Sequence, residues 1–148
     1  MKDLTMYNKI RQEMKTGDLL EWRTNSLLGK TIRLFTGKKV NHTGIVYALD
    51  GYRIPSHHVY TIEAEPNGIQ NTLLSVQLKK YDGEVFWYPL KQEYSHLGVA
   101  GIDWALEQEG IKYDYGSLFK NAIARVSTDA RKFFCSEFAF YYIVKSGL

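Results

Sequence analysis

Apart from one short candidate strand near the N-terminus, strand-like patterning is confined to residues 42–90 of this chain, and helical periodicity lies on both sides of it. The candidate strands are rich in Val, Ile, Tyr and Thr and are separated by Asp-Gly and Pro-Asn-Gly turn sequences. They cover 42–48, 58–65, 70–78 and 84–90. Consecutive strands joined by short turns pair antiparallel, so we expect an α+β fold with an antiparallel sheet of four to six strands flanked by helices.

Helical spacing marks the segments on either side of this block. Leu4, Tyr7, Ile10 and Met14 predict an amphipathic helix over residues 4–15, followed by a short strand at 18–22. Further helices are expected from Asn25 or Ser26 to Gly37, at about 93–109, near 118–126 and from Cys135 onward. The predicted order is therefore helices, then sheet, then helices.

Size and composition favour one globular domain spanning 1–148. The chain has 148 residues, 45% of them hydrophobic, and three prolines, with no repeat or linker. A single cysteine excludes an internal disulfide and favours a reducing compartment. The N-terminus lacks an apolar signal region and no apolar run is long enough for a membrane span, so we expect a cytoplasmic protein. A net charge of +3 without a basic stripe gives no indication of nucleic-acid binding.

The single cysteine, Cys135, has the local context of a reactive thiol. The surrounding segment, 132–141, predicts a short apolar approach and then a helix whose first turn holds the sulfur. The positive end of a helix dipole favours thiolate over thiol. A lone cysteine in apolar surroundings is by default a buried, inert thiol, so a catalytic role requires a histidine and a polar orienting group elsewhere.

Both partners are found upstream of the cysteine. His42 begins one candidate strand, and Glu63 lies near the end of the next. An imidazole can hold a thiolate–imidazolium pair and then protonate the leaving group, while a carboxylate fixes its tautomer and orientation. Glu65 shares a strand face with Glu63 and is the reserve candidate. The predicted catalytic residues are therefore Cys135, His42 and Glu63, although His42 could instead satisfy only a backbone carbonyl.

Five short motifs in this order resemble the circularly permuted, NlpC-like branch of the papain-like thiol hydrolases. They are Gly17-Asp18-Leu19-Leu20, His42-Thr43-Gly44-Ile45-Val46, Ile62-Glu63-Ala64, Tyr113-Asp114-Tyr115 and Cys135-Ser136-Glu137. In that branch the sheet comes first and the cysteine helix last. The resemblance covers about residues 16–145 and implies a permuted papain-like fold. It also suggests Tyr113 as an additional oxyanion donor, beside the backbone N–H groups at the start of the cysteine helix.

Other residues have weaker indications. Aromatic side chains such as Trp22 could line a substrate groove beside the thiol, although core packing is the default for them. His57 and His58 form a pair in an expected loop, and no further Cys/His cluster indicates zinc. Asp18 is expected to brace a turn. We expect no cofactor and no metal ligands.

The sequence therefore predicts a thiol hydrolase that cleaves an amide bond through an acyl-enzyme at Cys135. The resemblance implies a substrate that is a peptidoglycan-type peptide or an amide-linked lipid or amino-acid conjugate. Two alternatives stay open: an acyltransferase of the lecithin:retinol type, and a catalytically silent binding module that keeps the groove. The partner is a small molecule, peptide or lipid amide in the first two cases, and the sequence does not indicate an oligomeric state.

Overall fold

The computed structural model of the chain describes residues 3–27, 30, 33, 34, 37, 39–51, 57–65, 68–110 and 130–147, without the side chains of 130–137. None of the helices in this described part is long and apolar enough to cross a membrane.

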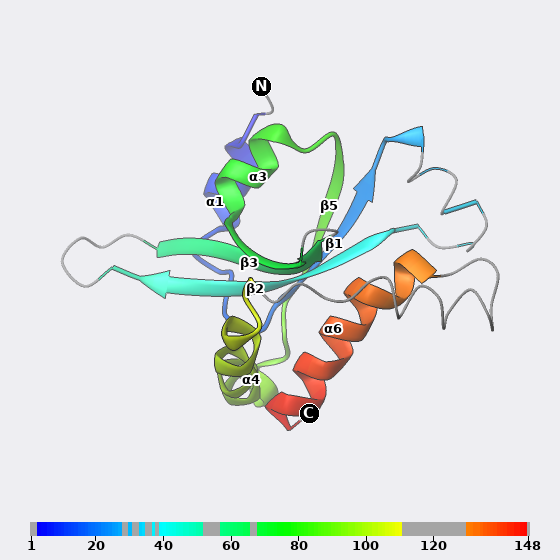
Figure 1. The fold of residues 1–148 in the computed structure, drawn as a ribbon. Helices are drawn as coiled ribbons and strands as arrows, with labels where there is room; N and C mark the ends of the chain where they lie inside the picture. The colour runs from blue at the N-terminus through cyan, green and yellow to red at the C-terminus, as the bar shows by residue number, and fades with distance from the viewer. Residues whose placement is uncertain are drawn as a thin grey trace.

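A five-stranded sheet forms the centre of the molecule (Figure 1). Its strands are β1 (Leu19–Thr24), β2 (His42–Asp50), β3 (His57–Glu65), β4 (Gly68–Leu73) and β5 (Gly83–Tyr88). They lie in the order β4-β3-β2-β1-β5, and every neighbouring pair is antiparallel. The predicted α+β class and antiparallel sheet are confirmed, whereas membership of the permuted papain-like fold stays a prediction.

Helices cover both faces of this sheet. They are α1 (Thr5–Ile10), α3 (Leu74–Lys80), α4 (Ser95–Glu107) and α6 (Ala130–Ser146), with a 3-10 turn η1 (Gln92–Tyr94) before α4. In Figure 1, α1 and α3 lie above the sheet, and α4 and α6 lie below it. Helices α4 and α6 pack against each other, and α6 also contacts β2 and β3.

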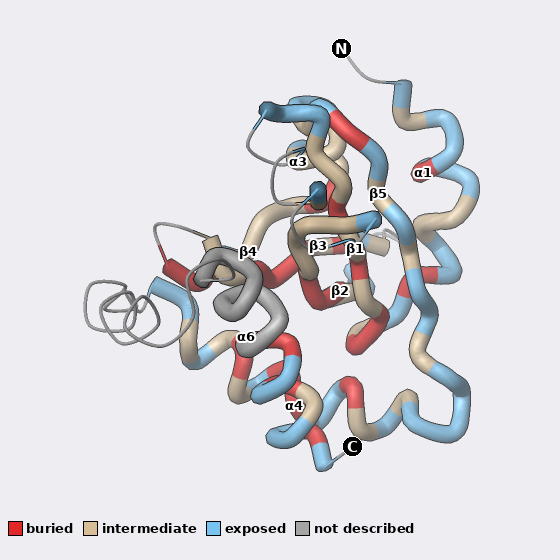
Figure 2. Tube along the Cα trace, turned by 90° about the vertical axis from the view of Figure 1, so that its right-hand side faces the viewer, coloured by how far each residue is buried: buried red, intermediate tan, exposed pale blue. Residues whose placement is uncertain are grey.

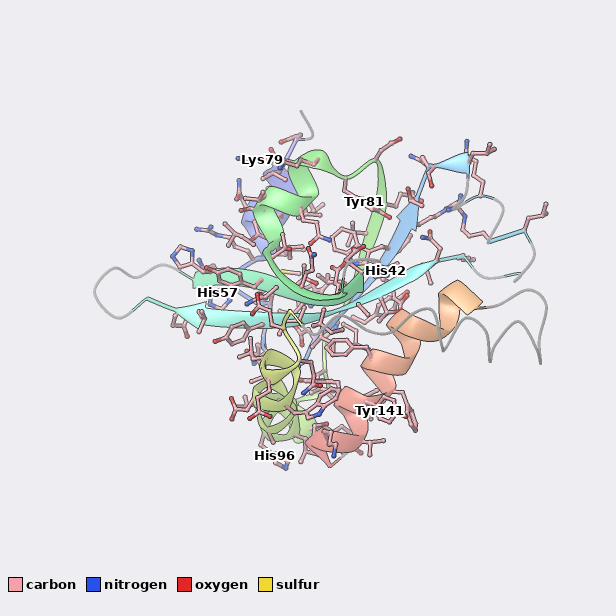
Figure 3. The ribbon with its side chains drawn as sticks, viewed as in Figure 1. His42, His57, Lys79, Tyr81, His96 and Tyr141 are labelled. Atoms are coloured by element: carbon pink, nitrogen blue, oxygen red, sulfur yellow. The ribbon has the colours of Figure 1, made fainter. Side chains whose placement is uncertain are left out.

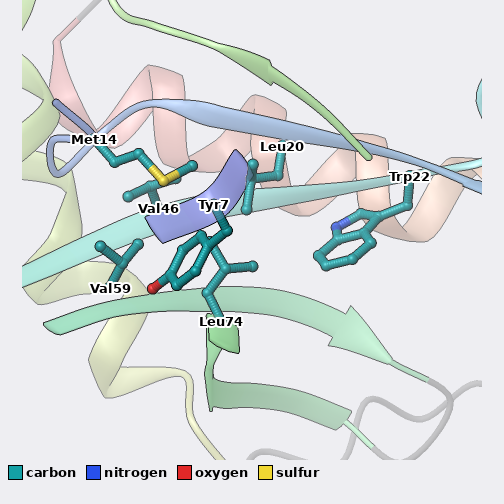
Figure 4. Close-up of a cluster of buried hydrophobic side chains, with 7 residues drawn as sticks. All are labelled: Tyr7, Met14, Leu20, Trp22, Val46, Val59 and Leu74. Carbon is teal, nitrogen blue, oxygen red and sulfur yellow. The ribbon is translucent and has the colours of Figure 1, made fainter. Parts of the chain in front are cut away.

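Strand alternation divides the core into two clusters. On the face of α1 and α3, the buried cluster is Tyr7, Met14, Leu20, Trp22, Val46, Val59 and Leu74 (Figure 4). On the face of α4 and α6, it is Ile45, Ile62, Ile69, Ile102, Ala105, Phe138 and Tyr142. Consecutive residues such as Ile45 and Val46 point to opposite faces, as the two-residue period of a strand requires. Figure 2 shows the buried segments along the central strands, whereas α1 is largely exposed.

Three predicted elements have different bounds in the structure. The run predicted as a strand at 70–78 ends as a strand at Leu73, and α3 begins at Leu74. Leu74 and Leu78, four residues apart, both pack on the first cluster, a spacing that puts two side chains on one face of a helix and of a strand alike. The first helix ends at Ile10 rather than near residue 15. His57 and His58 belong to β3 rather than to a loop.

The C-terminal helix begins earlier than predicted. It starts at Ala130, so Cys135 is the sixth residue of α6 and not in its first turn. The effect of a helix dipole falls off within the first turn, so the dipole contributes less to thiolate formation than the sequence suggested. Residues 132–134, which the sequence predicts as a short apolar approach, are part of the helix. The helix expected near 118–126 lies outside the described residues.

Candidate functional site

His42 and Glu63 form a hydrogen bond on the face of the sheet that carries α3. Nε2 of His42 lies 2.7 Å from Oε2 of Glu63, and the Glu63 side chain is 3% exposed. Figure 3 shows His42 at the start of β2. A carboxylate this buried requires hydrogen-bond donors or a nearby positive charge. The Nε2–H group of His42 is such a donor whether the ring is neutral or positively charged.

The register of β2 and β3 brings the two side chains together. Gly44 pairs with Glu63 across the strands, so His42 and Glu63 are diagonal neighbours on one face. A Cβ atom at Gly44 would lie 2.5 Å from Thr61 Oγ1 and 2.7 Å from Glu63 Oε1. The missing side chain at Gly44 therefore leaves the space through which Glu63 reaches His42.

Two further side chains hold the Glu63 carboxylate. The Thr61 hydroxyl donates to Oε1 at 2.6 Å, and the Gln77 side-chain amide donates to Oε2 at 3.1 Å. Thr61 comes from the same strand and face as Glu63, whereas Gln77 comes from α3. With His42, these donors give the carboxylate three hydrogen-bond partners, which hold both of its oxygens in place.

A second carboxylate lies beside this pair. Glu65 Oε1 is 3.6 Å from His42 Nε2, and its side chain is 40% exposed. Burial raises the pKa of Glu65 above its ordinary value, the charge of His42 opposes that shift, and Glu63 adds to it. One nitrogen of His42 and one oxygen from each glutamate all lie within 4.8 Å of one another. This grouping has the residue types and spacing of a divalent-cation site, which the sequence did not predict.

A cavity of about 350 Å³ opens beside the carboxylates, between β3, β4 and α3. Thr61, Glu63, Glu65 and Gln77 form its polar wall, and Tyr81 lies at one side. Burial raises the pKa of Tyr81 to about 12, so its hydroxyl stays protonated at neutral pH. The His42–Glu63 pair is thus next to a space large enough for a small ligand and is not surrounded on all sides by packed core residues.

Cys135 belongs to a helix that packs on the other face of the sheet. Phe138, three residues later and on the same helical face as position 135, is buried against Ile45 and Ile62. Val46 packs on the opposite face, and the hydrogen bond of His42 to Glu63, which also accepts from Gln77 of α3, puts His42 on that face as well. The side chain of Cys135 lies outside the described residues, and so does Tyr113. Their predicted roles therefore stay predictions.

The structure assigns core positions to two other residues singled out in the sequence. Trp22 is completely buried, and its ring meets that of Tyr81 edge to face at 4.7 Å. It packs under the site, and a contact with substrate stays a prediction. Asp18 is buried and accepts hydrogen bonds from the backbone of Lys15 and Leu90 and from the Trp87 indole, so it braces the start of β1 as expected.

Sequence reasoning missed Thr61 and Gln77. Thr61 could have been found, because a strand places residues 61, 63 and 65 on one face. Gln77 could not, because its segment had the composition of a strand and only the helix α3 directs it toward Glu63. The sequence also left open which glutamate orients His42, and the shorter distance favours Glu63.

Comparison with known proteins supports the fold and leaves the family open. No protein-family model matches the chain. No curated protein matches it either. Among solved structures, it is similar to the metalloprotein yiiX from Escherichia coli O157:H7 (DUF1105), with a TM-score of 0.58 and 20% identity over 90% of this chain and 67% of that one. At this identity the likeness shows a shared fold and carries no residue roles.

Proposed function

We propose that the protein is a thiol hydrolase of the permuted papain-like type, with Cys135 as nucleophile, His42 as base and Glu63 as orienting residue. The observation that carries the proposal is the 2.7 Å hydrogen bond between His42 Nε2 and the buried Glu63 carboxylate. A strand histidine paired with a buried carboxylate is the supporting half of a catalytic triad. The single cysteine supports action in a reducing compartment such as the cytoplasm.

The chemistry assigns a separate role to each nitrogen of His42. Glu63 accepts from Nε2–H, so Nδ1 is the nitrogen that takes the thiol proton. The thiolate attacks the amide carbonyl, and the imidazolium then protonates the leaving amine as the C–N bond breaks. Water, deprotonated by the same imidazole, hydrolyses the thioester and releases the acid.

The proposal sets a geometric requirement at the beginning of β2. Because α6 packs on the face opposite His42, the sulfur has to meet the imidazole past the end of the strand, where His42 is the first residue. Helix α6 contacts β2, and in Figure 1 its N-terminal end points toward this end of the strand. That direction is the one in which a thiol and Nδ1 could approach each other.

Alkylation of Cys135 tests the proposal without a known substrate. Iodoacetamide labelling, followed by mass spectrometry, should be fast at pH 6–7, below the ordinary thiol pKa of about 8.5. His42→Ala should slow it at that pH, and Glu63→Ala should slow it to a lesser extent. The matched control is His96→Ala, which removes an exposed histidine of α4 and should change nothing. Labelling that rises only above about pH 8 in the unsubstituted protein would show an inert thiol.

A panel of amide and ester substrates then separates the three candidate activities. A hydrolase releases the free acid and returns Cys135 to its starting mass. An acyltransferase leaves an acyl adduct on Cys135 until an acceptor amine or alcohol is added. A silent binding module forms no adduct with any substrate, and Cys135→Ser does not change its ligand binding.

The grouping of His42, Glu63 and Glu65 supports a second candidate function, binding of a divalent metal ion. Their three donor atoms lie within 4.8 Å of one another, and the structurally similar yiiX protein is described as a metalloprotein. One imidazole and two carboxylates fit Zn²⁺ or Mn²⁺. A bound ion would supply Lewis acidity and lower the pKa of a coordinated water.

Titration with Zn²⁺ and Mn²⁺ by calorimetry tests this candidate. The measurements use a Cys135→Ser background, because a thiolate is itself a zinc ligand. We expect one ion per chain, a higher melting temperature with metal, and loss of both in Glu65→Ala and His42→Ala but not in His96→Ala. If Glu65→Ala binds metal as the parent does, these three residues do not form the site. If EDTA does not change the rate of Cys135 alkylation, the reactivity of the thiol does not depend on a bound metal ion, and the hydrolase and metal proposals are independent of each other.

A further inference from the structure

One oxygen of Glu63 is shared by two donors from different parts of the fold. Oε2 lies 2.7 Å from His42 Nε2 and 3.1 Å from Gln77 Nε2. The other oxygen, Oε1, accepts from Thr61 at 2.6 Å. His42 and Thr61 are part of the sheet, whereas Gln77 comes from α3. The helix therefore acts directly on the oxygen that orients the histidine.

The sheet alone does not decide which glutamate pairs with His42. Glu63 and Glu65 lie two residues apart on one strand face, and both carboxylates are within 4 Å of Nε2, at 2.7 and 3.6 Å. The register pairs Gly44 with Glu63, so Glu63 is diagonal to His42, and the same register continued by two residues puts Glu65 opposite His42. Strand pairing on its own brings the directly opposite residue closer than the diagonal one. The observed preference for the diagonal glutamate therefore needs another cause.

The cavity beside the carboxylates leaves room for the Glu63 side chain to move, so a specific contact has to hold it in place. Glu63, Glu65 and Gln77 all line the same space of about 350 Å³. A glutamate side chain with open space next to it can adopt other rotamers, so packing alone does not fix its carboxylate. Thr61 holds one oxygen, but a single hydrogen bond leaves the group free to turn about it. A donor on the second oxygen removes that freedom.

We propose that Gln77 is a positioning residue that selects Glu63 over Glu65 as the partner of His42. Its amide fixes Oε2 at hydrogen-bond distance from Nε2, and Glu65 is then left at the longer distance. Without this amide, Glu63 turns toward the cavity and Glu65 takes its place. The consequence for catalysis rests on the proposed thiol chemistry, whereas the choice between the two carboxylates does not.

The test combines substitutions of Gln77 with removal of Glu65. Gln77→Leu removes the donor, and Gln77→Glu keeps size and shape but places a carboxylate against Glu63. The matched control is Gln70→Leu, which alters a glutamine that lines the same cavity and pairs with Glu63 across the strands without donating to it in any hydrogen bond described. Each variant is made with and without Glu65→Ala.

The first measurement is ¹⁵N NMR of the His42 ring, which reports its tautomer and the proton on Nε2. In the parent and in Gln70→Leu, Glu65→Ala should keep the carboxylate-bound Nε2–H signal of His42. In Gln77→Leu, Glu65→Ala should abolish the carboxylate-bound Nε2–H signal. Gln77→Glu should shift it as well, although a purely packing role would tolerate this isosteric change. The proposal is overturned if Gln77→Glu matches the parent, or if Glu65→Ala has the same effect with and without Gln77.

The second measurement is the pH dependence of Cys135 alkylation. With EDTA present, Glu65→Ala should lower the rate at pH 6.5 at least about fivefold more in Gln77→Leu than in the parent, since coupled residues are not additive. If Cys135 is unreactive in every variant while the NMR result is as expected, the hydrolase proposal fails and the selection by Gln77 stands. If alkylation is fast but insensitive to Gln77 and Glu65 in combination, the hydrolase stands and the selection fails.

Discussion

The two faces of the sheet differ in the side chains that cover them. The face under α4 and α6 is closed by apolar packing, in which Phe138 stacks on Trp104 with ring centres 5.6 Å apart and contacts Ile45 and Ile62. The face under α3 also has an apolar cluster, but one end of it holds a buried carboxylate, its donors and a cavity. The polar site therefore lies at the border of one core, and the C-terminal helix is attached to the other.

This difference follows from the alternation of a single pair of strands. In β3, Ile62 and Ala64 point to the α6 face, whereas Thr61, Glu63 and Glu65 point to the α3 face. The histidine–glutamate pair and the cysteine helix are thus separated by one sheet. Chemistry that needs both has to take place at the end of β2, and stability and site geometry should respond separately to changes on each face.

The largest effect is expected on the α6 face. Phe138→Ala should lower the free energy of unfolding by about 3–5 kcal/mol, because a buried aromatic ring is removed from a packed cluster. Its matched control is Phe140→Ala on the same helix, where the side chain is 60% exposed and the change should be within about 0.5 kcal/mol. Urea unfolding measures both. If the two variants lose the same stability, α6 does not pack through the face that carries Phe138.

A smaller loss of stability, with a change in the site, is expected on the α3 face. Gly44→Ala should cost about 1–3 kcal/mol, because the added methyl group meets Thr61 and Glu63 at less than contact distance. It should also displace the Glu63 carboxylate and alter the NMR signals of the His42 ring, which Phe138→Ala should leave unchanged. Leu49→Ala, at an exposed position of the same strand, serves as the control. A His42 spectrum unaffected by Gly44→Ala would contradict the close approach of Glu63 to this glycine.

The smallest effect concerns Glu21, a half-buried carboxylate on β1 that points to the α6 face. Burial raises its pKa above the ordinary value, and hydrogen bonding from Thr43 and the charge of His42 oppose the shift. Because the pKa of Glu21 is higher in the folded state than in the unfolded state, ionisation of Glu21 destabilises the fold once the pH rises above the unfolded-state pKa. Glu21→Gln should therefore stabilise the protein at pH 7 by less than about 1 kcal/mol, and the gain should vanish below about pH 4.

Thermal unfolding at several pH values measures the effect of Glu21→Gln. The control is Glu84→Gln, which changes an exposed member of the Arg23 ion pair and should show no gain at pH 7. A gain that is equal at pH 4 and pH 7 would mean that the ionisation of Glu21 has no part in it.

Much of this arrangement was accessible from local patterns. The α+β class, the antiparallel sheet, four of its five strands near their observed positions and the pairing of His42 with Glu63 follow from periodicity and turn residues. The strand at 70–78 was overestimated, because Leu74 and Leu78 are apolar at a spacing that either element allows in a short segment. Only contact with the cluster around Trp22 favours the helix.

The sequence by itself determined which residues can share a face, because the two-residue period of a strand is local: Thr61, Glu63 and Glu65 are on one side in any sheet. It also determined the chemical types available, with one thiol and a histidine before it in the chain. Only the tertiary structure decided that Glu63 rather than Glu65 lies at 2.7 Å from His42, and that α3 supplies Gln77 to hold it. Those contacts join elements that are distant along the chain, and their geometry depends on packing that no short segment encodes.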